Sequence, residues 1–388
     1  MSETSCIALS EIMATKAGSV DPAKFPDEVF DLYSIPAFDK GQPEVVAGSS
    51  IGSAKQIVRP GDVLLSKIVP HIRRSWVVGS DKGRRLIASG EWIVFRSERI
   101  NAAYLRHVLV SNPFHAQFMQ TVSGVGGSLL RARPTEVAKI PVPLPRLAEQ
   151  RRIAAILDHA DTLRARRREA LRQLDSLTQA IFIDMFGDSS NNRTGVRCVR
   201  LSEVTSRITD GTHLTPKFIS AGVPFIFVKN FKNGQIDFRT DKFISEEEHA
   251  ALYRRCPVEQ GDVLYTTVGA TYGQAVAIGT FTKFAFQRHV AHLKPDARKV
   301  LPEFLAVVMQ LPFVKRQADR WARGAAQPTI NLTELRQFEI PLPTIPMQRE
   351  FANRVAVVDK LKAAYKVSIA ELDELFASLQ HLAFRGAL

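Results

Sequence analysis

The chain has 388 residues, of which 45% are hydrophobic and 23% are charged, the composition of an ordinary globular protein with room for two or three hydrophobic cores. Its 52 Lys and Arg against 39 Asp and Glu give a formal net charge of +13. This favours a polyanionic partner, above all nucleic acid, with a basic protein that lacks such a partner as the alternative. Neither an apolar stretch of about 18 residues nor the basic and apolar start of a signal peptide occurs. The cysteines, Cys6, Cys198 and Cys256, show neither metal-ligand spacing nor an even disulfide set, so we expect a cytoplasmic protein without membrane contact.

The first half of the chain predicts a strand-rich part followed by a short helix. Short runs of β-branched and aromatic residues bounded by Gly, Pro and Asn are typical of strands, and they occur at 62–67, 75–79 and 91–96. A helix is expected over 102–111, and the prolyl segment 142–145 then interrupts regular structure.

Residues 150–186 contain neither Pro nor Gly and carry apolar side chains at a seven-residue period, which predicts one long helix that packs along another helix. One apolar row comprises Ile153, Ala160, Leu174 and Ile181, and the row three residues later comprises Ile156, Leu163, Ala170 and Leu177. Arg167 and Asp184 interrupt these rows, and Arg167 needs a partner if it is buried.

The second half predicts the same succession of elements. Strands are expected at 224–229, 262–267, 275–279 and 289–294, and a helix over 302–310 opens with Pro302, whose missing N–H costs nothing in a first turn. A second long helix is expected over 348–382. Its first apolar row comprises Phe351, Val358, Tyr365, Leu372 and Leu379, and its second includes Leu361, Leu375 and Leu382.

Short motifs recur in the same order in the two halves. A Gly-Asp-Val-Leu strand start lies at 61–64 and again at 261–264, and Cys-x-x-Leu-Ser-Glu precedes it in both halves. A Pro-Leu-Pro exit followed by Gln-Arg leads into each long helix. The offsets stay between 192 and 200 residues, which favours an internal duplication over chance.

The duplication predicts an α+β fold with two tandem-repeated units, each a globular part followed by a long helix. The expected boundaries are 1–145 for the first globular part, 146–190 for the first helix, 191–343 for the second globular part and 344–388 for the second helix. Loop-rich segments such as 21–53 and 208–242 have no counterpart in the other half. The framework therefore repeats while the exposed surface differs.

Catalytic motifs are missing or incomplete. Residues 112–114 (Asn-Pro-Phe) lack the second proline of an adenine methyltransferase motif, and 311–313 repeat them as helix punctuation. The glycines in 124–127 neither follow a strand nor open a helix, as a dinucleotide loop would. We therefore expect no catalytic residue, cofactor or metal, and an enzyme with an unrecognised active site is the alternative.

Polar residues at turns and strand ends of the second half are candidates for DNA contacts. The loop 209–213 is expected to enter a groove, with Thr and His donating to bases or phosphates; an ordinary Asp-Gly turn is the alternative. Amide and guanidinium side chains at strand ends are suited to adenine or guanine edges, although solvated strand ends explain them nearly as well. The candidates in this half are Thr209, Gly211, Thr212, His213, Lys229, Asn230, Thr267, Tyr272, Gln287 and Arg288.

The first half offers parallel candidates at similar places, most of which we expect to hold phosphate rather than to specify a base. They are Ser66, Lys67, Arg73, Arg74, Arg131 and Arg133. The Gly-rich segments 124–128 and 324–327 would let a backbone approach closely. The arginines within 164–168 are expected to be solvated or to face a partner.

In their order, these motifs resemble the specificity subunit of Type I restriction–modification systems, over essentially the whole chain. The resemblance rests on the two Gly-Asp-Val-Leu strands, on residues 210–216, on the Pro-Leu-Pro exits into Gln-Arg helices and on residues 379–386. It implies two target-recognition domains that each read one half of a split double-stranded DNA sequence. It also implies that the long helices pair as an antiparallel coiled coil that acts as a spacer.

The same resemblance implies as partners two modification subunits, which are adenine-N6 methyltransferases, and two restriction subunits, which carry the motor and the nuclease. Methyl donor, ATP and Mg²⁺ belong to those subunits, so this chain is expected to be non-catalytic. A helix of 37 residues spans about 55 Å, or at most about 16 base pairs of duplex. The alternative is a structural adaptor whose helices recruit proteins and whose globular parts bind no DNA.

Overall fold

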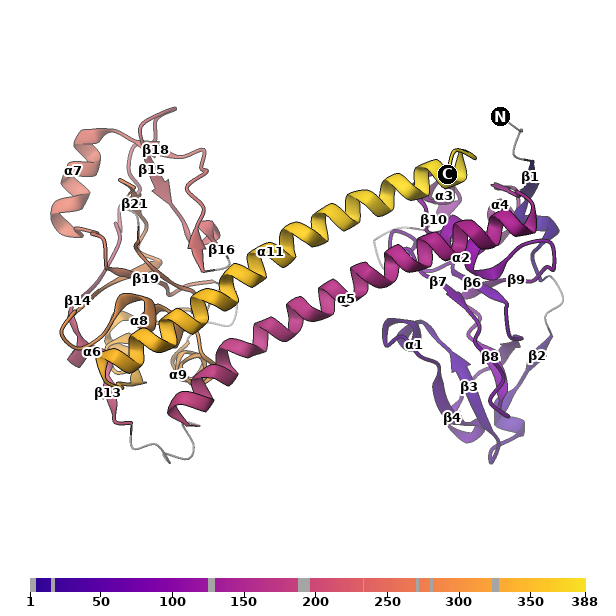
Figure 1. The fold of residues 1–388 in the computed structure, drawn as a ribbon, viewed down its shortest axis with the longest axis horizontal. Helices are drawn as coiled ribbons and strands as arrows, with labels where there is room; N and C mark the ends of the chain where they lie inside the picture. The colour runs from indigo at the N-terminus through magenta and orange to yellow at the C-terminus, as the bar shows by residue number, and fades with distance from the viewer. Residues whose placement is uncertain are drawn as a thin grey trace. The chain divides into compact units, whose positions relative to one another are not determined.

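The computed structural model describes residues 5–14, 18–124, 130–187, 196–232, 234–269, 272–279, 282–322 and 328–388. It has an α+β fold (Figure 1). The chain separates into two compact units: unit 1 comprises Met1–Glu169 with Lys366–Leu388, and unit 2 comprises Ala170–Tyr365. Each long helix therefore contributes one stretch to unit 1 and the other to unit 2.

Unit 1 contains a five-stranded sheet with the order β2-β5-β8-β3-β4, in which β3 and β8 are parallel and the other neighbours are antiparallel. A second sheet has the antiparallel order β7-β6-β9, and a third pairs β1 with β12. The strands are β1 (Cys6–Ala8), β2 (Ser19–Val20), β3 (Val29–Tyr33), β4 (Glu44–Ala47), β5 (Lys55–Ile57), β6 (Val63–Ser66), β7 (Ser75–Val77), β8 (Arg85–Ala88), β9 (Trp92–Phe95), β10 (Val122–Ser123), β11 (Arg131–Ala132) and β12 (Pro141–Pro143).

Short helices cover these sheets. Helix α2 packs on β6 and β7, and α3 is capped at its N-terminus by Ser111, whose hydroxyl accepts a hydrogen bond from the Phe114 N–H. The helices of this unit are α1 (Ile35–Asp39), α2 (Ala102–Leu109), α3 (Asn112–Gln120) and α4 (Pro134–Val137), with 3₁₀ turns at Leu9–Glu11, Pro22–Lys24 and Gly48–Ser50.

Unit 2 contains a four-stranded antiparallel sheet with the order β14-β22-β19-β20 and a three-stranded sheet with the order β18-β15-β21, in which β15 and β21 are parallel. Helix α8 packs on β19 and β20. The strands are β13 (Cys198–Arg200), β14 (Thr205–Asp210), β15 (Val223–Ile226), β16 (Phe231–Lys232), β17 (Gln235–Ile236), β18 (Phe243–Ile244), β19 (Val263–Thr266), β20 (Ala275–Ala277), β21 (Ala285–Phe286), β22 (Val290–Pro295) and β23 (Glu339–Pro341). The helices are α6 (Leu201–Val204), α7 (Glu246–Arg255), α8 (Pro302–Val308), α9 (Pro312–Trp321) and α10 (Leu332–Leu335), with a 3₁₀ turn at Val228–Asn230.

The central strand of each unit is buried on both faces. Along β6, Val63 and Leu65 point into one hydrophobic cluster and Leu64 into another. Along β19, Val263 and Leu264 separate in the same way. Because successive side chains of a strand point to opposite faces, the apolar run of each Gly-Asp-Val-Leu motif fits a strand between two cores.

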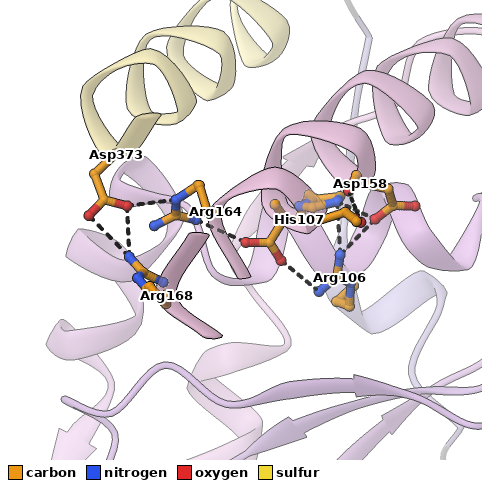
Figure 2. A network of polar contacts seen from close by, with 8 residues as sticks. Arg106, His107, Asp158, Arg164, Arg168 and Asp373 are labelled. Atoms are coloured by element: carbon orange, nitrogen blue, oxygen red, sulfur yellow. Dashed lines mark hydrogen bonds and ion pairs between the residues drawn. The ribbon is translucent and has the colours of Figure 1, made fainter. Parts of the chain in front are cut away.

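The structure contains the two long helices that the apolar period predicts, α5 (Leu147–Phe186) and α11 (Ile345–Phe384). In unit 1, Asp373 of α11 accepts hydrogen bonds from Arg164 and Arg168 of α5 (Figure 2). In unit 2, Phe182 of α5 packs against Phe351 of α11, with ring centroids 5.8 Å apart.

The first predicted row of each long helix faces inward, but the second does not. Leu163 is 40% exposed and Leu361 is 44% exposed, whereas Leu157 and Val355 are buried. In both helices the inward second row lies four residues after the first row, not three as predicted. A seven-residue period consists of one step of three and one of four, and the prediction took them in the wrong order. Polar residues at that row, such as Arg164, hide it in the sequence.

A buried glutamine at the start of each long helix makes the same three hydrogen bonds. Gln150 Oε1 accepts from the Asn101 N–H at 2.6 Å, and its amide donates to the carbonyls of Arg99 and Pro145. Gln348 Oε1 accepts from the Leu301 N–H at 2.8 Å, and its amide likewise donates to two carbonyls, at 2.9 Å each. Each Gln-Arg motif therefore marks the point where a long helix is fastened to its globular part.

The expected strands at 62–67, 75–79 and 91–96 coincide with β6, β7 and β9 to within a few residues. The segment 21–53, which reads as loop-rich, contains β3 and β4. Its Pro and Gly residues mask two short strands: β3 is stabilised by pairing with β8, far along the chain, and β4 by pairing with β3.

Candidate nucleic-acid interface

An open cavity of about 270 Å³ on unit 2 collects several of the predicted DNA-contact residues. We call it the unit-2 groove. It is lined by Thr212, His213, Leu214, Thr215, Pro216, Phe218, Phe225, Phe227, Gln287, Arg288 and His289. The groove therefore brings together the loop after β14 and the turn between β21 and β22.

The two segments are joined through their backbones. The Thr212 N–H donates to the Phe286 carbonyl at 3.0 Å, and the Arg288 N–H donates to the Thr212 carbonyl at 2.9 Å. A side chain at Gly211 would collide with the carbonyls of Phe286 and Gln287, so the close approach requires glycine at this position. The polar side chains at the mouth of the groove are thus held by a fixed backbone.

The loop itself is braced from within. The Thr212 hydroxyl donates to the Leu214 carbonyl at 2.9 Å and accepts from the Leu214 N–H at 3.2 Å. His213 Nε2 lies 2.7 Å from Asp210 Oδ2. These contacts hold Leu214 at the tip with 82% of its surface exposed, an apolar group suited to a thymine methyl.

Aromatic rings with cations beside them form the floor of the groove. Phe225 lies 5.4 Å from Phe218 and 5.1 Å from Phe227, measured between ring centroids. Lys242 Nζ lies 5.7 Å above the Phe218 ring and Lys229 Nζ 5.8 Å above the Phe227 ring. Two lysines outside the lining therefore place positive charge beside its aromatic rings, as a phosphate-binding surface requires.

His289 lies beside Arg288 at the groove. Burial, followed by the charges of Arg288 and His213, lowers the pKa of His289 below its ordinary value. The ring is therefore neutral at neutral pH and presents one donor and one acceptor.

Of the other predicted residues in this half, some have side chains that the fold already uses. Asn230 is buried and bonds the Phe227 N–H and the Asp237 carbonyl, and the buried Thr267 hydroxyl donates to the His289 carbonyl at 3.1 Å. Tyr272 donates to Asp319 and lies beneath Lys315, away from the residues that line the groove. Thr209 lies half-buried in β14.

Unit 1 has a related open cavity of about 200 Å³, whose lining includes Gln56, Lys67 and Gly90. The backbones around the two cavities match. In unit 1 the Lys67 N–H donates to the Glu91 carbonyl, and the Lys67 carbonyl accepts from the Ala132 N–H. In unit 2 the Thr267 N–H donates to the His289 carbonyl, and the Thr267 carbonyl accepts from the Ile330 N–H. Lys67 therefore occupies in unit 1 the position of Thr267 in unit 2.

The remaining candidates of the first half make contacts within unit 1. Arg74 is buried and its guanidinium donates twice to Asp39 at 3.0 Å, and the buried Ser66 hydroxyl donates to the Ile68 carbonyl. Exposed Arg73 donates to Asn112, exposed Arg131 pairs with Glu91 at 3.0 Å, and Arg133 donates weakly to the Thr121 carbonyl. Residues 125–128 and 324–327, in the two predicted Gly-rich segments, lie outside the described residues.

A Cys-His-Asp sequence of contacts in unit 2 has the order of a nucleophile, a base and an orienting acid. Cys256 Sγ lies 3.3 Å from His292 Nδ1, and His292 Nε2 lies 2.7 Å from Asp262 Oδ2. Burial raises the pKa of the Cys256 thiol to about 12, so the thiolate that a nucleophile needs is not formed. This buried set supports the fold rather than a reaction.

Within the described residues, no three His, Cys, Asp or Glu side chains come together as a metal site. None of the described helices is long and apolar enough to cross a membrane.

Residues 200–372 match the family model described as the Type I restriction modification DNA specificity domain, and this match includes every residue that lines the unit-2 groove. Solved structures of this class share the fold. A chain from a structure titled for complex assembly and conformational transition of the type I R-M system aligns over 99% of this chain and 98% of its own, with TM-score 0.62 and 23% identity. The Type-I restriction-modification system S subunit from M. genitalium aligns over 98% of this chain and 96% of its own, with TM-score 0.57 and 11% identity.

Curated relatives carry the same description. The chain is 29% identical over 174 residues to the EcoBI specificity subunit of Escherichia coli, which is 44% of this chain and 36% of that protein. It is 21% identical over 320 residues to the EcoKI specificity subunit of E. coli K12, 76% of this chain and 68% of that protein. The MjaVIII specificity subunit of Methanocaldococcus jannaschii is 22% identical over 64% of this chain and 62% of its own length. The chain is thus a relative of the Type I restriction–modification specificity subunits, as its motifs predict.

Proposed function

We propose that this chain is the DNA sequence-specificity subunit of a Type I restriction–modification complex, that it binds a two-part double-stranded target and that it catalyses nothing itself. The observation that carries the proposal is the position of the unit-2 groove inside the segment that matches a DNA specificity domain. Amide, guanidinium and imidazole groups at the groove are suited to base edges, and the neighbouring lysines are suited to phosphates.

The chain is organised as two tandem recognition domains with spacer helices, at 1–145, 146–190, 191–343 and 344–388. Three equivalences support this: Gln150 and Gln348 make the same hydrogen bonds, β1 pairs with β12 as β13 does with β23, and the two open cavities adjoin equivalent backbones. The first domain reads its half-site with Lys67 and the exposed Arg73, Arg131 and Arg133. The second reads with Thr212, His213, Gln287 and Arg288, supported by Lys229.

The long helices form an antiparallel coiled coil that serves as the spacer. Within unit 1, the later residue Arg164 of α5 meets Asp373 at 2.6 Å, whereas the earlier Arg152 meets Leu388. Within unit 2, Asp175 meets Lys362 at 3.2 Å. In unit 1, rising numbers on α5 therefore meet falling numbers between the end of the chain and α11. Within unit 2, Asp184 of α5 meets Arg354 of α11, so the order is reversed there as well, and both units support antiparallel pairing.

Two modification and two restriction subunits dock on this chain. Support comes from apolar side chains on the outward faces of the long helices, since exposed apolar rows are typical of protein interfaces. They include Leu163, Leu177, Ile183, Val357, Leu361, Val367, Leu375 and Leu382, each at least 38% exposed. The second row predicted for the coiled-coil seam is therefore assigned to partner contact.

A base-resolution methylation map of the host genome, with and without the gene for this chain, tests the proposal. We expect one split adenine-methylated motif to disappear on deletion. An unchanged map from cells that express all partner subunits would contradict the proposal and favour a structural adaptor.

Binding of the assembled complex to duplex DNA separates the adaptor from the specificity subunit. Phosphate contacts make affinity fall as salt rises, and a specific subunit prefers its motif over random duplex at every salt concentration. An adaptor would show neither property. Methyl transfer or cleavage by the purified chain alone would indicate an enzyme.

A further inference from the structure

A polar network in unit 1 connects the globular part to α5 (Figure 2). Arg106 Nη2 of α2 donates to Asp158 Oδ1 of α5 at 2.7 Å, and His107 Nε2 lies 2.7 Å from the same oxygen. Asp161 of α5 lies 3.9 Å from Arg106 Nη1 and accepts a hydrogen bond from Arg164 at 2.9 Å. The network thus joins Arg106 and His107 of α2 to three charged residues of α5.

The network continues to α11. Asp373 accepts hydrogen bonds from Arg164 Nε at 2.6 Å and from Arg168 Nη2 at 2.7 Å. The Arg164 guanidinium lies 4.3 Å above the Phe376 ring, and the His107 ring lies 6.1 Å from the same ring. Directional contacts therefore run from α2 through α5 to α11 (Figure 2).

His107 shows that stability alone does not explain these contacts. Its side chain is 1% exposed, and its Nδ1 has no hydrogen-bond partner within the described residues. The neutral tautomer with the proton on Nε2 donates to Asp158 and leaves Nδ1 as a buried, unpaired acceptor, which costs free energy. The partners of this buried ring are partly exposed, at 27% for the Arg106 side chain and 47% for that of Asp158, so their ion pair adds little net stability and is expected to contribute geometry.

Unit 2 attaches its globular part without this network. Equivalent positions in the two halves differ by 200 residues in the globular parts and by 198 in the long helices. The unit-2 equivalents of Arg106, His107 and Asp158 are therefore Ala306, Val307 and Ala356. The attachment in unit 2 rests on Phe304, Phe186 and Phe351, which are in mutual contact. Unit 1 has the corresponding contact between Tyr104 and Phe384, with ring centroids 6.0 Å apart, and has the polar network in addition. Unit 2 thus holds its globular part on the helices with apolar residues at positions 306, 307 and 356.

We propose that Arg106, His107 and Asp158 are positioning residues that fix the angle of the first globular part on the long helices and so restrict the number of base pairs accepted between the two half-sites. This rests on the proposed function. One added base pair moves a half-site by about 3.4 Å and rotates it by about 35°. Directional polar contacts resist the rotation that would follow the half-site, whereas an apolar contact surface slides more easily.

The triple variant R106A/H107V/D158A tests the proposal, because it gives unit 1 the residues that unit 2 has at the equivalent positions. Removing the three partners together also avoids leaving one charge buried and unpaired. The variant is placed at the native locus, so that the full complex is assayed, and the genome is mapped for methylation at base resolution. We expect unchanged half-site sequences, with about tenfold more methylation at sites whose spacer is one base pair longer or shorter.

R99A is the matched control, since Arg99 is exposed in the same globular part and its guanidinium pairs with exposed Glu11 at 3.3 Å. Its map should equal that of the unmodified chain. A triple variant that still methylates a single spacing would overturn the proposal, and so would a change in half-site sequence.

D158N keeps the size of the side chain and removes its charge, so it guards against a triple variant that fails to accumulate. It should shift spacing in the same direction to a smaller extent. Should the triple variant be absent from an immunoblot, a D158N map with unaltered spacing overturns the proposal. Failure of the proposed function is visible separately, as an unchanged map when the unmodified gene is deleted.

Discussion

At the scale of single residues, the polar side chains predicted to contact DNA in the second half of the chain have different roles. The Arg288 guanidinium is exposed, and its hydrogen bond to His289 Nε2 is long, at 3.5 Å. Asn230 and Thr267 instead make their hydrogen bonds inside unit 2. The residue type does not distinguish these cases, because the same amide or hydroxyl group bonds a ligand when it is exposed and the protein backbone when it is buried.

Arg288→Ala should weaken binding of the assembled complex to its target by about 5- to 150-fold, because one good guanidinium–base contact contributes about 1–3 kcal/mol. Competition binding at fixed salt measures this. Arg298→Ala is the control, since the side chain is exposed and bonds only Asp296 next to it among the described residues, and it should change affinity by less than about twofold. Equal loss on target and random duplex would show that Arg288 contacts phosphate; no loss would remove it from the interface.

His107 should make unit 1 less stable in acid. Burial and then the charge of Arg106 lower its pKa in the folded chain, against the opposing effects of Asp158 and Asp161. Protonation therefore favours the unfolded chain, so the contribution of the neutral ring is complete above the unfolded pKa of about 6.5 and is lost as the pH falls below it.

Thermal midpoints of the unmodified chain and of His107→Val, measured at about pH 8 and about pH 5.5, test this expectation. The unmodified chain should lose more stability than the variant between the two values. A difference between the two proteins that does not change with pH would show that His107 does not titrate in this range.

At the scale of elements, the two long helices are the part of the fold on which sequence and structure agree best. The apolar period predicts both helices, because a helix that buries one side needs apolar residues at that spacing. The Gln at the start of each helix bonds three backbone groups of the adjoining globular part. The inward second row was displaced by one position in the prediction. Polar residues such as Arg164 occupy it, and their partner Asp373 lies on the other helix.

Gln150→Ala and Gln348→Ala should each destabilise their own unit by about 1–3 kcal/mol, because each leaves buried backbone groups unpaired. Urea denaturation followed by circular dichroism measures the shift in midpoint. Gln120→Ala at the exposed end of α3 is the control and should leave the midpoint unchanged. A large effect for one glutamine and none for the other would argue against equivalent fastening of the two units.

At the scale of the whole molecule, recognition is divided between two parts of the chain that share a framework and differ in their loops. The segments that differ most are 21–53 and 208–242. The first carries β3 and β4 of unit 1, and the second carries β15 and the loop after β14 that lines the unit-2 groove. Specificity and framework are therefore encoded in different residues.

Replacing residues 1–145 by the corresponding region of a relative should change one half of the methylated motif and leave the other half as it was. The second globular part and its groove are untouched by this exchange. The methylation map of the hybrid strain shows the result directly. A motif altered in both halves would contradict the modular organisation.

By itself the sequence determined the long helices, the strands at the two Gly-Asp-Val-Leu motifs and the repeated order of motifs. These features depend on periodic apolar burial, which a linear pattern records. Only the tertiary structure decided which polar side chains reach the groove, which row of each helix faces outward and that Arg106, His107 and Asp158 meet. Such contacts join residues about 50 or more positions apart, and their burial depends on how the intervening chain packs.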